Sequence, residues 1–198
     1  FSLSFFQAHA DEIKENKKNN VLCMCKTKFA AKGRGVSVLG MGNYELKGQG
    51  VMRCRTVNLF KPVPLTEETH VLEVKNLEDL KNLNHYLETI ENNPVEIKMN
   101  VNMDFVASPF QIGCTLGRVD LLGYSNGWTL TKNVQELLGD YKIGGAHGTF
   151  GIGLGSFVAA RVGKKSLAFQ MSLQVARGFG GSFGFSTLKM SLDEEKTI

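Results

Sequence analysis

The sequence predicts a mainly β fold, an antiparallel sandwich or partly closed barrel of about ten strands, with one helix covering an edge or end. Three observations support this prediction. Residues 144–184 hold eleven glycines among alternating apolar and small polar residues. Residues 95–105 alternate strictly between apolar and polar types, as in a strand with one buried face. Only residues 76–91 show a long run of leucines at helical spacing.

Length and composition suit a single domain. We expect an N-terminal helical extension over 1–20, one β-rich domain over 21–192 and a solvated tail over 193–198. Hydrophobic residues make up 42% of the 198 residues and include 13 Phe, so a core can be buried. The net charge of +4 permits an anionic partner but does not indicate nucleic acid. The start at Phe1 is consistent with removal of a leader, although FSLSFF is too short for a secretory signal.

The first third of the chain predicts a short helix followed by glycine-punctuated strands. Ser4 can cap a helix over 4–16. Strands are expected over 21–29, 34–41 and 50–60, because apolar and β-branched residues there are separated by glycines. The two prolines of 61–65 lack a backbone donor and predict a rigid connector.

The middle of the chain contains the clearest helix. A short strand over 70–74 leads to a helix over 76–91, for which Asn76 is a suitable N-cap. Glu78 and Asp79 lie in its first turn, where the helix dipole favours anions. The alternation that follows predicts a half-exposed strand over 95–105.

The last part of the chain predicts further strands and one short helix. Strands are expected over 110–117 and 118–124, with turns near Gly117 and over 125–127. A short helix over 132–138 would end at Gly139.

The final third predicts three or four antiparallel strands with two unlike faces. In 167–175 the Leu, Phe, Met and Val side chains share one face, opposite Ala168, Gln170, Ser172 and Gln174. Phe150, Ile152 and Leu154 likewise oppose a face of glycines, which leaves room for a partner's backbone, a ring or a lipid chain. A change of phase predicts a bulge between Phe185 and Leu188.

The preferred interpretation of the four cysteines is buried free thiols in a reducing compartment. The alternatives are a disulfide or a metal site. Cys23 and Cys25 would share one face of a strand, and Cys54 with Cys114 or a histidine could complete a set of ligands.

The motifs point to no enzyme, cofactor or metal. Ser156 breaks the dinucleotide-loop pattern after Gly151, and no Walker A sequence is present. The histidines, His9, His70, His85 and His147, form no His–Glu or His–His pairs; His147, in a glycine-rich turn, is the one most open to a function.

A basic group is the one candidate site. Residues 141–192 contain no Asp or Glu, and basic residues there lie near several phenylalanines. They predict a contact with an anionic surface, made by Arg161, Lys164, Lys165 and Arg177.

Parts of the second half resemble two glycine-rich families. The segments FQIGCTLGRVDLLGY, VQELLGDYKIGGAHGTFGIGLG and RGFGGSFGFSTLKM resemble the SYLF lipid-binding domain. The Gly-x-Gly-x-Gly strand, SLAFQMSLQV and FSTLKMSL are similar to an uncharacterised family of alphaproteobacterial envelope proteins. The first resemblance implies lipid binding, and the second implies an organelle of such descent, the mitochondrion.

From these observations we expect a non-enzymatic structural or assembly subunit of a larger membrane-associated complex, with other protein subunits as partners. Its small, glycine-lined faces would suit close docking. One alternative is a lipid-binding module that recognises anionic membranes through the basic glycine-rich half. A second is a viral capsid or tail component. The expected location is the mitochondrion, or otherwise a reducing intracellular compartment.

Overall fold

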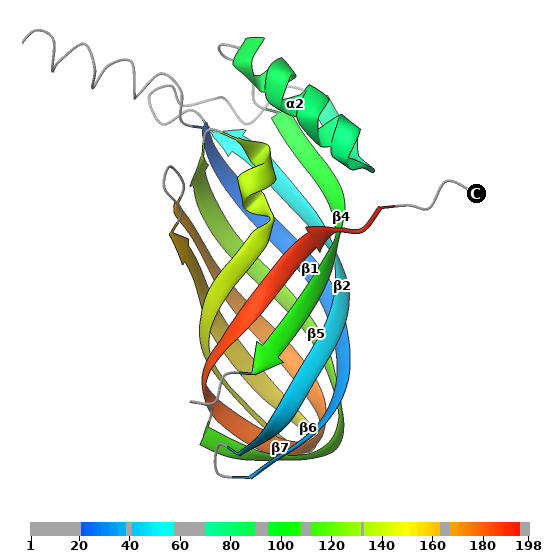
Figure 1. Cartoon of the computed structure of the whole chain (residues 1–198), viewed down its shortest axis with the longest axis vertical. Helices are drawn as coiled ribbons and strands as arrows, with labels where there is room; N and C mark the ends of the chain where they lie inside the picture. Colours follow the sequence, from blue (N-terminus) through cyan, green and yellow to red (C-terminus); the bar gives the residue numbers. More distant parts are fainter. Residues whose placement is uncertain are drawn as a thin grey trace, which may run out of the picture.

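The protein is mainly β, with one curled sheet and one α-helix (Figure 1). A computed structural model describes residues 21–38, 41–57, 70–89, 95–107, 112–131, 133–162 and 167–194. Over these residues the elements follow one another in the order β1 (Val21–Val38), β2 (Met41–Val57), β3 (His70–Val74), α2 (Leu77–Thr89), β4 (Val95–Ala107), β5 (Ile112–Thr131), the 3₁₀ helix η1 (Val134–Leu137), β6 (Gly139–Val162) and β7 (Leu167–Leu192).

Hydrogen bonds between the strands close the sheet into a ring. The described strands lie in the order β3-β4-β2-β1-β5-β7-β6, and an additional pairing joins β4 to β7. β7 can pair with two strands along one edge because it is long. Its residues 167–183 pair with β5, and 186–192 pair with β4. All these pairings are antiparallel except that of β3 with β4, which is parallel.

The two halves of β6 approach each other where the ring closes. β6 pairs with β7 from Gly139 to Val162 in continuous register. A Cβ added at Gly145 would lie 2.8 Å from the backbone oxygen of Ser156, so this contact requires glycine. The sheet therefore has an inner side and an outer side.

Three phenylalanines from different strands meet inside the closed sheet. Phe29, Phe105 and Phe157 are buried, with ring centroids 5.8 to 6.1 Å apart. The apolar residues at alternate positions from Val95 to Phe105 are buried with them, so the half-exposed strand predicted over 95–105 is confirmed. The core thus lies within the ring and not between two separate sheets.

Two helices lie at one end of the curled sheet (Figure 1). The Asn76 side chain accepts a hydrogen bond of 2.8 Å from the backbone of Asp79, which confirms the predicted N-cap of α2. Leu80 and Leu83 are buried among the side chains of this helix that the structure describes. The short helix predicted over 132–138 is the 3₁₀ helix η1, capped by Asn133, and it ends before Gly139.

Several predicted strand boundaries were wrong, because strands run through glycines. β1 continues across the predicted break after residue 29, and β5 continues across the predicted turns at Gly117 and 125–127. The final third forms two long strands instead of three or four. In a strongly curled sheet glycine permits close approach without ending the strand.

The predicted bulge is also elsewhere. The β6–β7 register is continuous between Phe185 and Leu188. The irregularity falls between Leu116 and Asp120 of β5, opposite Gly178. Gly117 and Gly178 have φ values of 81° and 144°, which L-residues with side chains rarely adopt.

Other predictions fall partly or wholly outside the described residues. The extension over 1–20, the helix over 4–16 and the connector over 61–65 lie there. Of the tail over 193–198, Asp193 is bonded to the sheet: its backbone N–H donates to the Asn100 carbonyl at 2.9 Å.

Candidate docking surface on β5, β6 and β7

The first part of β7 has its apolar side chains outside the closed sheet and its polar side chains inside. Met171 and Leu173 are 58% and 66% exposed, whereas Gln170, Ser172 and Gln174 are buried. A strand of a water-soluble protein usually has the opposite arrangement. The sequence predicted these two faces correctly, and the structure shows which of them is outside.

The residues of β5 and β6 that pair with these positions of β7 also have their apolar side chains outside the closed sheet. Val175 of β7 pairs with Leu122 of β5 on one side and Leu154 of β6 on the other, and both leucines are 67% exposed. We call the resulting surface the apolar face. It consists of Leu122, Tyr124, Trp128, Ile152, Leu154, Val158, Leu167, Phe169, Met171, Leu173 and Val175.

Aromatic pairs mark the two ends of the apolar face. Trp128 and Phe169 stack with ring centroids 6.2 Å apart at one end. Beyond the other end, Phe150 and Phe179 pack edge to face at 5.3 Å, and Phe150 is 88% exposed. Exposed apolar surface of this extent is typical of an interaction site on a protein.

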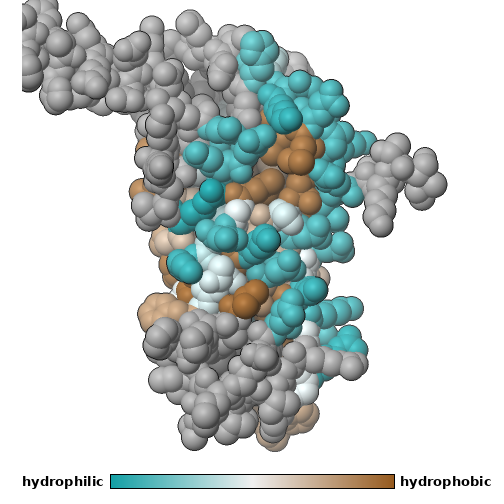
Figure 2. All heavy atoms as spheres, in the orientation of Figure 1, coloured by the Kyte–Doolittle hydropathy of each residue, from teal (hydrophilic) through white to brown (hydrophobic). Residues whose placement is uncertain are grey.

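The opposite wall of the sheet is polar outside. Exposed basic side chains project from β1 and β2, among them Lys26, Lys28, Lys32, Lys47 and Arg53. Figure 2 shows hydrophilic residues over the side of the molecule that carries β2, β4 and α2. The closed sheet is therefore two-sided: one wall is polar and the other is the apolar face.

Small and polar side chains fill the inner side of the apolar wall. Ser125 and Thr129 of β5 and Ala168 and Ala176 of β7 are buried there. The Gln170 Oε1, Ser172 Oγ and Gln174 Oε1 atoms are buried without a hydrogen-bond partner among the described residues. On this wall the alternate small and polar side chains of β7 are therefore buried within the ring, and its large apolar side chains are the ones that a partner can reach.

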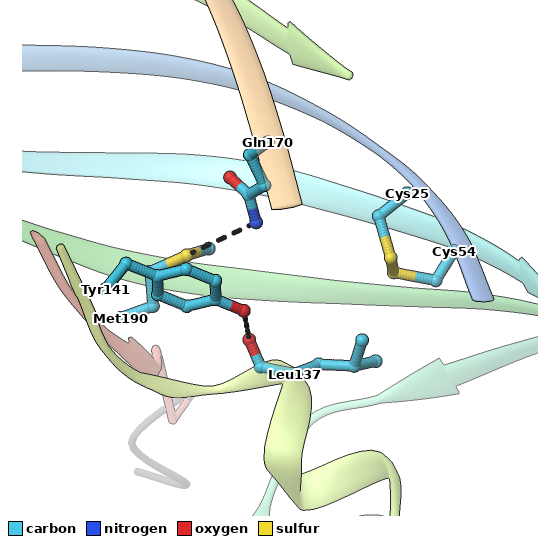
Figure 3. Close-up of a disulfide and its surroundings, with 6 residues drawn as sticks. All are labelled: Cys25, Cys54, Leu137, Tyr141, Gln170 and Met190. Carbon is cyan, nitrogen blue, oxygen red and sulfur yellow. Dashed lines mark hydrogen bonds between the residues drawn. A yellow bond between two sulfur atoms is a disulfide. The ribbon is translucent and has the colours of Figure 1, made fainter. Parts of the chain in front are cut away.

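A polar seam joins η1 to the sheet (Figure 3). The Tyr141 hydroxyl donates to the Leu137 carbonyl at 2.7 Å, and the Arg161 guanidinium donates to the carbonyls of Glu136 and Leu138. Burial raises the pKa of Tyr141 to about 12, although the charge of Arg161 acts in the opposite direction. The Gln170 amide donates to the Met190 sulfur at 3.8 Å. The contacts of Tyr141 and Arg161 hold the 3₁₀ helix against the ring.

The predicted anionic-surface residues do not form one cluster among the described residues. Arg161 is half-buried in the polar seam. Arg177 is exposed on the rung of Asp120 and Ile152, at the border of the apolar face. Lys164 and Lys165 lie outside the described residues, as does the side chain of His147, whereas His85 is exposed on α2.

The preferred interpretation of the cysteines was wrong for two of them. Cys25 and Cys54 are register partners in β1 and β2 and are joined by a disulfide (Figure 3). They are therefore not available as metal ligands. Cys23 is a buried free thiol, and burial raises its pKa to about 12, so it is unreactive.

Within the described parts of the chain, no group of three or more His, Cys, Asp or Glu side chains could hold a metal ion. None of the described helices is long and apolar enough to cross a membrane. The candidate site is the apolar face, an exposed surface that can bind apolar material.

Comparison with models of protein families, with curated proteins and with solved structures gives no match for this chain. The apolar face was missed in the sequence because alternation marks two faces without orienting them. The available signal was the pairing of one large apolar face with a face of Gly, Ala, Ser and Gln in both β6 and β7.

Proposed function

We propose that this protein is a non-enzymatic structural or assembly subunit of a larger membrane-associated complex, and that it docks through the apolar face. One observation carries the proposal: eleven apolar side chains from three adjacent strands lie together outside the ring, and the exposed ones among them are 37 to 67% exposed. Keeping such a surface in water is unfavourable by about 25 cal/mol for each Å² that a partner would cover.

The polar wall supports an arrangement with two environments. Lysines and arginines on β1 and β2 favour water or a polar neighbour. The apolar face favours the opposite surroundings. A boundary between membrane and water, within an assembly, provides both.

The disulfide bears on location. A bond between Cys25 and Cys54 persists in oxidising compartments. These two cysteines therefore no longer support the predicted location in a reducing compartment. A mitochondrial location stays a proposal, and fractionation of the source cells with an antibody to the protein would test it.

Recognition of anionic headgroups is a weaker candidate function. Of the residues predicted for it, Arg161 has its guanidinium bonded to backbone carbonyls, and Arg177 stands beside Asp120 on the neighbouring strand. The two described residues of the predicted basic group therefore support a headgroup contact less well than the apolar face supports an apolar contact.

Native mass spectrometry of the protein, extracted from its source in a mild detergent, tests the proposal. We expect a defined large assembly that loses this subunit when Leu154 is replaced by Asp. A matched control is Val51→Asp, because Val51 is an exposed apolar residue on the polar wall. A protein that runs alone, with neither subunits nor lipid attached, contradicts the proposal, and closed shells of this chain alone would favour the viral alternative.

A further inference from the structure

We infer that the apolar face contacts membrane lipid directly, with its side chains in the acyl-chain region of one leaflet and the polar wall directed away from the membrane. The inference rests on the proposed function and deepens it, because it names the material that the apolar face binds.

The outward side chains of the apolar face offer hydrocarbon without charge. Among the described residues, the outward positions of β7 from 167 to 175 are Leu, Phe, Met, Leu and Val. On the adjoining strands the outward polar residues within these rungs are Tyr124, Asn126 and Ser156. Charged side chains are unfavourable in a bilayer interior, and on β5 and β7 the outward charged side chains begin only at the border rung of Asp120 and Arg177.

The shape and hydrogen bonding of the surface favour lipid over a protein partner. Protein interfaces usually contain about one hydrogen bond for every 100 to 200 Å². The backbone groups of β5 and β7 are already paired within the sheet. The outer side of a closed sheet is also convex (Figure 1), so it presents ridges to fluid acyl chains instead of a pocket for a partner's anchor residue.

The dimensions of the face match a shallow membrane contact. From Leu167 to Val175 the strand extends about 26 Å, at about 3.3 Å for each residue, and three strands spaced about 4.8 Å apart form the width. Trp128 and Tyr124 belong to the residue types that concentrate at the membrane–water interface. Arg177 at the border can extend its guanidinium toward lipid phosphates while its aliphatic stem stays with the face.

The charged residues of the polar wall favour contact with one leaflet over a position that spans the bilayer. Lys26 and Lys28 lie on β1, directly beside Asn126 and Tyr124 of β5. Spanning the bilayer would place these ammonium groups in hydrocarbon, which is unfavourable. Contact with one leaflet places only β5, β6 and β7 in the apolar region.

Trp128 provides a test, since it is the only tryptophan of the chain and belongs to the apolar face. The full chain would be mixed with vesicles of phosphatidylcholine alone, and with vesicles that also contain phosphatidylglycerol. Emission of Trp128 would be recorded with lipids brominated either near the headgroup or near the chain end. Leu173→Asp and Leu154→Asp are the test variants and Val51→Asp is the control, each checked for native circular dichroism and thermal unfolding.

We expect Trp128 emission to move to shorter wavelength on both kinds of vesicle, with stronger quenching by bromine near the headgroup. Each test variant should lower the partition coefficient about tenfold or more, because it replaces a buried apolar contact with a charge. Val51→Asp should stay within about twofold of the unchanged protein, since its side chain is outside the contact.

Two results would overturn the inference. The first is binding only to anionic vesicles, lost in high salt and unaffected by Leu173→Asp, which assigns the contact to headgroups. The second is no response to any vesicle. If Leu154→Asp then still removes the subunit from its native assembly, the apolar face binds protein, and the proposed function stands without this inference. If the assembly is also unaffected, both fail.

Discussion

Phe29 occupies the space that any side chain at position 123 would need. A Cβ added at Gly123 would lie 2.3 Å from the Phe29 Cζ atom. The ring cannot move aside easily, because it also packs against Phe105 and Phe157. Gly123 is therefore required by the packing of the closed sheet.

We predict that Gly123→Ala lowers the free energy of unfolding by about 1 to 3 kcal/mol through overpacking. Gly144→Ala is the control, because its added Cβ would meet the Phe185 ring at 3.5 Å, an ordinary contact distance. That control should change stability by at most about 0.5 kcal/mol. Urea unfolding followed by circular dichroism measures both, and equal midpoints for the two variants would contradict the steric explanation.

Tyr141 makes stability depend on pH in the alkaline range. Its pKa is raised from 10.0 to about 12, so the folded protein keeps the hydroxyl proton at pH values where the unfolded chain has lost it. This contribution is complete below pH 10 and is lost as the pH rises toward 12. Its size is about 2 to 3 kcal/mol.

We expect Tyr141→Phe to flatten this alkaline loss. At neutral pH the variant should be less stable by about 1 to 3 kcal/mol, because the buried Leu137 carbonyl loses its donor. The difference in unfolding free energy between the two proteins, measured from roughly pH 8 to pH 12, gives the contribution of Tyr141 separately from that of other titrating groups. This range covers the pKa values of Tyr141 in the unfolded and the folded chain. Parallel curves over that window would show that Tyr141 titrates normally.

At the scale of elements, the β1–β2 hairpin is fixed by its register and by one covalent bond. Cys25 faces Cys54 across the ladder, 29 residues apart in sequence. Closing a loop of this length restricts the unfolded chain, and the chain-entropy estimate is about 3 to 4 kcal/mol.

We predict that a reducing agent lowers the unfolding free energy by about 3 kcal/mol. Cys25→Ala/Cys54→Ala should lack this response, whereas Cys23→Ala should keep it, because Cys23 is a free thiol. Guanidinium unfolding with and without dithiothreitol measures the effect. A reducing agent that changes Cys23→Ala no more than the double variant would exclude a structural disulfide.

Elements with strong local signals could be predicted from the sequence. The Asn76 cap of α2 and the alternation of β4 depend on neighbouring residues alone. Strand ends could not be predicted, because a glycine that ends one strand and a glycine that permits close contact in another look alike. Gly127, for example, lies within β5, where an added Cβ would be 2.2 Å from the Phe169 carbonyl oxygen.

At the scale of the whole molecule, the ring divides into a wall that is polar outside and a wall that is apolar outside. Such a protein should self-associate in water without lipid or detergent, since the apolar faces of two copies can cover each other. The polar wall has few matching residues: among the described residues of β1, β2 and β4, the exposed large apolar side chains are Met24, Val51 and Val106.

We predict that Leu122→Asp/Leu154→Asp/Met171→Asp makes the protein monomeric in aqueous buffer, whereas the unchanged protein forms larger species. All three side chains are more than half exposed, so the thermal midpoint should change little. Size-exclusion chromatography with light scattering measures the change, and Val51→Asp/Val106→Asp is the control. Equal elution of both variants would contradict a special role for the apolar face.

Local patterns in the chain are enough to predict that it is mainly β, where α2 begins, and that residues 150–155 and 167–175 have one large apolar face and one small or polar face. These properties follow from local spacing, which short-range geometry makes readable. Two properties could not be predicted from local spacing: which face lies outside, and which cysteines are joined. Both depend on how distant strands pair: closure of the ring buries Gln170, Ser172 and Gln174 on its inner side and leaves the alternate apolar residues outside, and the β1–β2 register places Cys25 opposite Cys54.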